Sequence, residues 1–197
     1  MKAIFFHVPK TGGVAIGTLL HKVEEVETPP HIEYDIIHTK YSQEILDSSI
    51  KCAFVRNPFD RFVSAYHYLY QQDKNHPRWG HDYKCHIILR QYKGFSDFCR
   101  VFADIKEINN YCHFLPMEKY LCKDNKIMMD FIGRFENLEE DYRAMKKIIG
   151  IHAPKLEKRN VSIHGPWQEY YKDSFAFDLV RRWYRKDFEI FNYSMEI

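Results

Sequence analysis

The stretch Lys2-Ala-Ile-Phe-Phe-His-Val-Pro-Lys-Thr-Gly-Gly13 places a glycine turn directly after a short apolar run. The run from Lys2 to His7 predicts a strand that is buried on both faces of a sheet. From Val14 to about Glu24, apolar residues recur at three- and four-residue spacing, which is typical of a helix with one apolar face. The chain is therefore predicted to begin with a strand, a glycine turn and a helix.

A second stretch repeats this order. Lys51-Cys-Ala-Phe-Val55 is another continuous apolar run, and Asn57 can cap a helix whose first turn contains Pro58 and Asp60. One face of that helix is predicted to pack in the core, because it carries the aromatic row Phe59, Phe62, Tyr66 and Tyr70. The sequence thus contains two strand-loop-helix units.

Further elements follow the same alternation. In chain order they are a strand at Tyr34–His38, a helix at Tyr41–Asp47, a loop at Gln71–Tyr83, a helix at Phe95–Phe102, a strand at Ile127–Phe131, and helices at Asn137–Ile149 and Ser174–Phe188. Such alternation predicts an α/β fold of three layers, with a mainly parallel central sheet flanked by helices. We expect a single domain over residues 1–197, with ligands bound at the carboxyl ends of the strands.

Composition excludes several classes of protein. The chain carries 29 basic and 27 acidic residues without a long run of either sign, so no nucleic-acid partner is indicated. No stretch approaches the roughly 20 apolar residues that cross a bilayer, and a strand-like run follows Met1 closely. We therefore expect a cytoplasmic protein without a membrane span. The five cysteines include no Cys-x-x-Cys pair, which favours reduced thiols and no metal site.

The glycine turn predicts an anion site. A turn between a strand and a helix presents backbone N–H groups and the positive end of the helix dipole, which together hold phosphate well. Gly12 and Gly13 allow close approach, Lys10 can reach phosphate oxygens, and Thr11 can donate a hydroxyl hydrogen bond. Lys10 precedes the glycines, whereas in nucleoside triphosphatases the lysine follows them. This order favours a transferase that relies on lysine and backbone dipoles rather than on a metal ion.

Two motifs carry a resemblance to a known family. His7-Val-Pro-Lys-Thr-Gly-Gly13 resembles the 5′-phosphosulfate loop of carbohydrate-type sulfotransferases, which have a P-loop-like α/β fold. Phe54-Val-Arg-Asn-Pro-Phe-Asp-Arg-Phe-Val-Ser-Ala-Tyr66 is similar to the 3′-phosphate motif of that family. The similarity continues in Phe131–Leu138 and in the carboxy-terminal residues Tyr170-Tyr171 and Asp187–Phe191.

The resemblance implies roles for individual residues. Lys10 would stabilise the leaving phosphate oxygen, residues 11–14 would hold the 5′-phosphate, and Arg56 with Ser64 would hold the 3′-phosphate. The guanidinium fork of Arg56 suits two phosphate oxygens at once. Many relatives carry hydroxyl residues where this chain has Val14 and Ala15, so here the backbone N–H groups would act in their place.

The resemblance also implies a donor and a reaction. The donor would be 3′-phosphoadenosine 5′-phosphosulfate (PAPS), the product adenosine 3′,5′-bisphosphate, and the acceptor a hydroxyl, most often of a saccharide, although lipids, small alcohols and tyrosines stay open. A histidine suits the role of general base at neutral pH, and His38 is the candidate, with His7 as a rival. Lys158 and Arg159 are either solvated or help to close over the donor's phosphates.

Two other functions stay open at this point. A small kinase or nucleotidase could use the same turn for ATP, but it would need magnesium and a carboxylate to hold the ion. A nucleotide-binding protein without catalytic activity could keep the fold and lose turnover, and Val14 and Ala15 are the residues that motivate this alternative.

Overall fold

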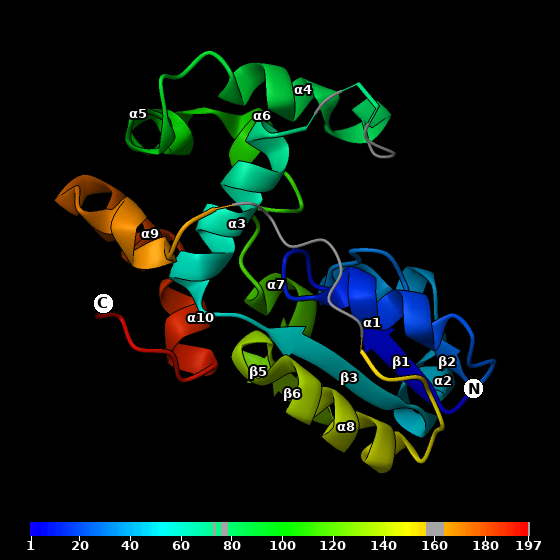
Figure 1. The fold of residues 1–197 in the computed structure, drawn as a ribbon. Helices are drawn as coiled ribbons and strands as arrows, with labels where there is room; N and C mark the ends of the chain where they lie inside the picture. The colour runs from blue at the N-terminus through cyan, green and yellow to red at the C-terminus, as the bar shows by residue number, and fades with distance from the viewer. Residues whose placement is uncertain (73, 76–78, 157–163, 197) are drawn as a thin grey trace. The chain divides into compact units, whose positions relative to one another are not determined.

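The computed structural model describes residues 1–72, 74–75, 79–156 and 164–196, and Figure 1 traces their helices and strands. The chain divides into two compact units. Unit 1 comprises Met1–Asn57 and Pro116–Val161, and unit 2 comprises Pro58–Leu115 and Ser162–Ile197. Each unit is thus built from two separate segments of the chain. The single-domain organisation over residues 1–197 stays a prediction.

Unit 1 is built on a four-stranded sheet in the order β2-β1-β3-β6. The strands are β2 (Val26–Glu27), β1 (Ala3–Phe6), β3 (Ile50–Val55) and β6 (Phe131–Arg134), and all neighbours are parallel. Two predicted strands are confirmed, the one in the run that begins at Lys2 and the one that ends just before Arg56. β1 and the second half of β3 are buried, as their continuous apolar runs require. The predicted mainly parallel α/β sheet is therefore confirmed.

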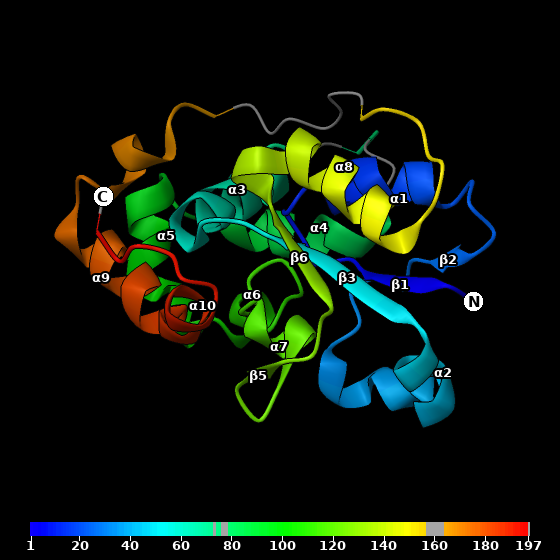
Figure 2. The ribbon, with the colours of Figure 1, turned by 90° about the horizontal axis from the view of Figure 1, so that it is seen from below.

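Helices cover both faces of this sheet. In Figure 2, α1 (Gly13–Leu20) and α8 (Leu138–Ile149) lie on one side of the strands and α2 (Gln43–Ser48) lies on the other. Ile16 of α1 and Met145 of α8 are buried in one cluster with strand residues such as Phe5. On the opposite face, the ring of Phe6 stacks on that of Tyr34 at 5.9 Å between centroids. These helices and the sheet form the three predicted layers.

Two predicted elements of unit 1 differ from the structure. Residues predicted as a strand at Tyr34–His38 form a 3-10 helix, η1 (Tyr34–Thr39), because Tyr34 and Ile37 are buried at a spacing of three while Ile36 is 51% exposed. The predicted strand at Ile127–Phe131 is split. Its first residue belongs to β5 (Lys126–Ile127), which pairs antiparallel with β4 (Cys122–Lys123), and its last residue opens β6.

Short helices also lie on the second face of the sheet. The helix expected from Tyr41 begins at Gln43, because the Ser42 side chain caps it by accepting from the Ile45 N–H at 3.3 Å. A further one-turn helix, α7 (Glu118–Leu121), contacts η1. On the first face, α8 ends where Gly150 adopts a left-handed conformation, as the sequence predicts.

Unit 2 is helical in the part that the structure describes. Its elements are α3 (Pro58–Tyr70), α4 (Trp79–Leu89), α5 (Phe95–Val101), η2 (Phe102–Asp104), α6 (Lys106–Asn109), η4 (Trp167–Tyr171), α9 (Ser174–Trp183) and α10 (Arg185–Ile190). Three residues of the aromatic row of α3, Phe59, Phe62 and Tyr66, are buried in the core as predicted, and Tyr70 is partly buried against it. Phe62 contacts four other phenylalanines and Tyr184. Tyr184 also divides the predicted last helix into α9 and α10, and its hydroxyl donates to the Phe114 carbonyl at 2.7 Å.

Two further predictions concern the cysteines and membrane-spanning helices. None of the five cysteines, all of which lie in the described ranges, forms a disulfide. Burial raises the pKa of the Cys52 thiol in β3 to about 12, which makes it a poor nucleophile. Among residues 1–72, 74–75, 79–156 and 164–196, no helix is both long enough and apolar enough to span a bilayer.

The close packing of β3 on β6 can be tested at Gly133. A Cβ at Gly133 would lie 2.4 Å from the ring of Phe54, which is fully buried. Gly133→Ala should therefore lower the free energy of unfolding by about 1–3 kcal/mol. Gly17→Ala is the matched control, since no described residue beyond its own helix lies within 4 Å of an added Cβ, and it should be neutral or stabilise α1 by up to about 1 kcal/mol. Urea titration measures both, and equal effects of the two substitutions would contradict this packing.

Candidate functional site

The glycine turn after β1 has the geometry expected of an anion site. Lys10 and Gly12 have left-handed backbones, with φ of 67° and 83°, and α1 begins at Gly13. The N–H groups of Ala15 and Ile16 both donate to the Gly12 carbonyl. The N–H groups before them, in the first turn of α1, have no acceptor within the helix. Together with the helix dipole they favour a bound anion.

Thr11 has a different contact from the one expected. Its hydroxyl is predicted to donate to the anion, but in the structure it donates to the Val8 carbonyl at 2.9 Å, and Thr11 is 1% exposed. A hydroxyl has a single hydrogen, so in this arrangement it is already used. The bond closes the turn upon itself. Thr11 would therefore contribute to an anion site through its backbone N–H.

His7 is packed against the turn. A Cβ at Gly13 would lie 2.0 Å from the His7 ring, so glycine is the residue that permits this contact. The His7 ring also meets the ring of His31 edge-on, at 4.6 Å between centroids. These contacts give His7 a packing role behind the turn.

Gly12 is constrained from a different side. A Cβ there would lie 3.0 Å from the Leu138 side chain and 3.3 Å from the Phe135 ring, and the backbone is left-handed. Phe135 belongs to the 3-10 helix η3 (Phe135–Asn137), which follows β6, and Leu138 opens α8. The turn after β1 thus rests on the segment that follows β6.

Arg56, which follows β3, contacts both the turn after β1 and the segment after β6. Its side chain is 7% exposed, and Nη1 donates to the Lys10 carbonyl at 3.1 Å. The guanidinium carbon lies 4.0 Å from the centroid of the Phe135 ring, a cation–π contact. The structure therefore brings together two features that are far apart in the sequence, the glycine turn and Arg56. The planar guanidinium has further N–H groups of the kind that bind phosphate oxygens.

Two residues of the site carry no role in the sequence analysis. Phe135 stacks on Arg56, and the Glu136 carboxylate accepts a hydrogen bond from the Asn57 N–H at 2.6 Å. The motif Phe131–Leu138 is part of the family resemblance, but the resemblance implies no function for it. The missing information was the pairing of β6 beside β3, which places Arg134 opposite Val55.

Two predicted site residues lie elsewhere. His38 was expected at the carboxyl end of a strand, and this placement is wrong: it is an exposed residue near the end of η1. Its role as base stays a prediction. Ser64 lies in α3 of unit 2 and is 1% exposed, and its contact with a 3′-phosphate also stays a prediction. Val14 is 51% exposed at the start of α1, and Lys158 and Arg159 lie outside the described residues.

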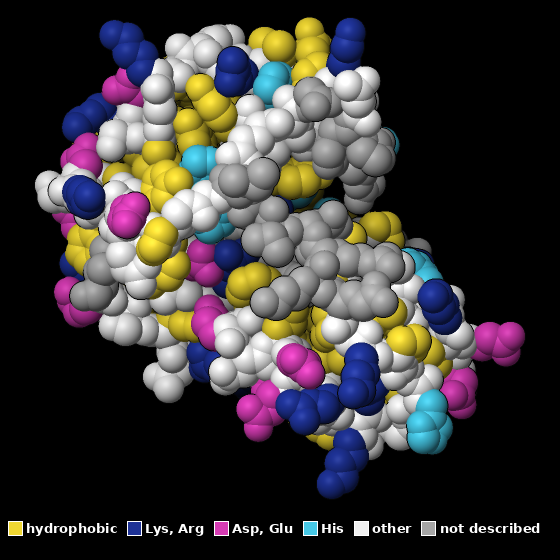
Figure 3. All heavy atoms as spheres, in the orientation of Figure 1, with side chains coloured by type: hydrophobic (Ala, Val, Ile, Leu, Met, Phe, Trp, Pro, Cys, Tyr) yellow, Lys and Arg dark blue, Asp and Glu magenta, His cyan; other side chains and the backbone are white. Residues whose placement is uncertain are grey.

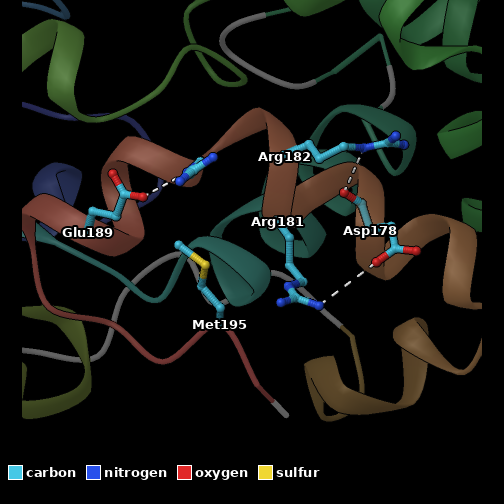
Figure 4. Close-up of a pocket in the computed structure, with 6 residues that line it drawn as sticks. Asp178, Arg181, Arg182, Glu189 and Met195 are labelled. Atoms are coloured by element: carbon cyan, nitrogen blue, oxygen red, sulfur yellow. Dashed lines mark hydrogen bonds and ion pairs between the residues drawn. The ribbon is translucent and has the colours of Figure 1, made fainter.

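Basic side chains also occur away from the glycine turn. On the face drawn in Figure 3, basic side chains are interspersed with acidic ones. A pocket of about 330 Å³ lies in unit 2, lined by Arg181, Arg185 and Glu189 among others, and Figure 4 shows it. Two of the arginines that line it face carboxylates, because Arg185 pairs with Glu189 at 2.7 Å and Arg181 approaches Asp178 at 4.0 Å. Within the described ranges, no three His, Cys, Asp or Glu side chains could hold a metal ion.

The contact between His7 and Gly13 yields a double-mutant test. Gly13→Ala should lower the free energy of unfolding by about 1–3 kcal/mol, because the new methyl group overlaps the His7 ring. In a His7→Ala background the methyl group has room, so the same substitution should cost clearly less. Chemical denaturation of the four proteins measures this coupling. Strict additivity of the two substitutions would show that the His7 ring does not occupy this position.

The chain is similar to known proteins over much of its length. The profile of the sulfotransferase family matches residues 1–194. Carbohydrate sulfotransferase 11 of Rattus norvegicus is 28% identical over 174 residues, which are 76% of this chain and 48% of that protein. Carbohydrate sulfotransferase 9 of Homo sapiens is also 28% identical, over 176 residues, and carbohydrate sulfotransferase 10 of Xenopus laevis is 25% identical over 98% of this chain and 65% of its own length.

This chain spans about half the length, or less, of the first two of these relatives. No solved structure matches it significantly. The family profile, however, covers nearly all of its residues, including both motifs and the segment after β6. The chain belongs to the sulfotransferase family.

Proposed function

We propose that this protein transfers a sulfuryl group from PAPS to a hydroxyl group of a carbohydrate. The observation that carries the proposal is the hydrogen bond from Arg56 to the carbonyl of Lys10, at 3.1 Å, which holds a guanidinium beside a glycine turn. A turn alone supports an anion site of any kind. The Arg56 guanidinium, fixed beside the turn, adds a second site for an anion. The pair fits a nucleotide that carries phosphate groups at both its 5′ and 3′ positions.

The residues present fit such a donor. Gly13 leaves no space for a side chain and Gly12 has a left-handed backbone, so the turn can bring backbone N–H groups against the 5′-phosphate. Val14 would take part through its N–H, in place of the hydroxyl that many relatives carry. Arg56 would bind the 3′-phosphate with its planar fork. Ser64 would add a contact to the same phosphate, as the family motif implies.

The donor supplies an activated sulfuryl group, whose bond to the 5′-phosphate oxygen breaks as a new bond forms to the acceptor oxygen. Lys10 would stabilise the negative charge that develops on the leaving phosphate oxygen. A base must accept the proton of the acceptor hydroxyl, and His38 is the proposed base. The products are a sulfate ester and adenosine 3′,5′-bisphosphate. The names of the relatives support a saccharide as the acceptor.

The donor class can be tested by calorimetry. The protein should bind adenosine 3′,5′-bisphosphate more tightly than adenosine 5′-phosphate, and more tightly than ATP with magnesium. Arg56→Ala should weaken the bisphosphate by about tenfold to a hundredfold, the worth of a charged hydrogen-bonded pair, and should leave adenosine 5′-phosphate nearly unchanged. A preference for ATP with magnesium would exclude this proposal. Equal losses for both adenosine ligands would remove Arg56 from the 3′-phosphate.

The proposed base requires a separate experiment. His38→Ala should lower turnover of labelled PAPS with a saccharide acceptor by about a hundredfold or more, since general bases contribute on this scale. Binding of adenosine 3′,5′-bisphosphate should be unchanged. His21, a second histidine of unit 1, provides the control, and His21→Ala should keep parental turnover. If His38→Ala also turns over at the parental rate, another residue is the base.

A further inference from the structure

We infer that Glu136 is a positioning residue for Arg56, and that it thereby sets the preference of the site for a 3′-phosphorylated nucleotide. The inference rests on the proposed function and concerns the same site. Glu136 lies in η3, directly after β6, at the strand end next to that of β3. Its carboxylate accepts from the Asn57 N–H at 2.6 Å, across 79 residues of sequence.

This bond acts on the backbone of Arg56. The N–H of Asn57 belongs to the peptide group that also contains the Arg56 carbonyl carbon, and a peptide group is planar and rigid. A carboxylate that fixes this plane therefore restricts the backbone rotation that follows the Cα of Arg56. Hydrogen bonds from a backbone N–H to a charged carboxylate are shorter and stronger than those between neutral groups. Glu136 is thus suited to hold the start of the Arg56 side chain.

The far end of the side chain is held as well. Phe135, the residue before Glu136, lies 4.0 Å from the guanidinium carbon, and the Lys10 carbonyl accepts from Nη1 at 3.1 Å. Two of these three contacts come from consecutive residues of η3. The segment after β6 therefore fixes both ends of Arg56 before a ligand binds. Pre-orienting a recognition group in this way lowers the entropy lost on binding, which raises affinity for the ligand that it contacts.

The same two strands supply a matched control. At the opposite end of β3, the Lys51 N–H donates to the carboxylate of Asp130 at 2.7 Å, again across 79 residues. Asp130 also pairs with the Lys51 ammonium at 3.1 Å. Lys51 and Arg56 are five residues apart in an extended segment, which corresponds to about 16 Å. Removing Asp130 should thus weaken the junction of the same strands at least as much, but far from Arg56.

The test compares nucleotide preference in three variants. The ratio of the dissociation constants of adenosine 5′-phosphate and adenosine 3′,5′-bisphosphate is measured for the unaltered chain and for Glu136→Ala, Glu136→Gln and Asp130→Ala. Glu136→Ala should lower this ratio by about five- to tenfold, the net worth of one hydrogen bond. Glu136→Gln keeps an acceptor oxygen and should retain most of the preference. Asp130→Ala should keep the full ratio, although thermal unfolding shows a comparable loss of stability.

The outcomes separate the inference from the function on which it rests. An unaltered chain with no preference for the bisphosphate would refute the proposed donor site itself. If the unaltered chain has the preference and Glu136→Ala keeps it, Glu136 does not position Arg56. An equal loss of the ratio in Asp130→Ala would also overturn the inference, because the effect would then reflect general weakening of the β3–β6 pair.

Discussion

The parallel pairing of β3 with β1 on one side and with β6 on the other is the constraint on which the site depends. Because the three strands point the same way, the residues that follow them meet at one edge of the sheet. The turn after β1 supplies backbone N–H groups, the end of β3 supplies Arg56, and the segment after β6 supplies Phe135. The guanidinium contacts both of its neighbours. A cation, a helix amino terminus and an aromatic ring are thereby held together at this edge.

Close packing, rather than charge, sets the shape of this edge. His7 fills the space beside Gly13, while Phe135 and Leu138 close upon Gly12. These contacts hold the backbone of the turn in place. The single hydrogen of the Thr11 hydroxyl is used within the turn, which stabilises its curvature. In the proposed site, backbone N–H groups of the turn would act in place of the side-chain hydroxyls that the chain lacks at Val14 and Ala15.

Much of this arrangement could be predicted from local sequence. The buried runs before His7 and Arg56 predicted β1 and β3, and the glycine turn and the arginine were recognised as two parts of one site. His38 was misplaced because Tyr34-Asp-Ile-Ile-His38 can be read as a strand, whereas burial of Tyr34 and Ile37 three residues apart selects a 3-10 helix. The contribution of Glu136 and Phe135 could not be predicted, since it depends on which strand pairs beside β3. That pairing joins residues about 80 positions apart, which no local pattern encodes.

The proposed donor site requires one nucleotide to contact the glycine turn and Arg56 at the same time. A crystal structure of the protein with adenosine 3′,5′-bisphosphate would show whether it does. We predict that the 5′-phosphate lies on the N–H groups of Gly12, Gly13 and Val14, and that the 3′-phosphate lies within hydrogen-bond distance of the Arg56 guanidinium. A nucleotide bound away from the glycine turn, or bound there with its 3′-phosphate remote from Arg56, would exclude this donor site.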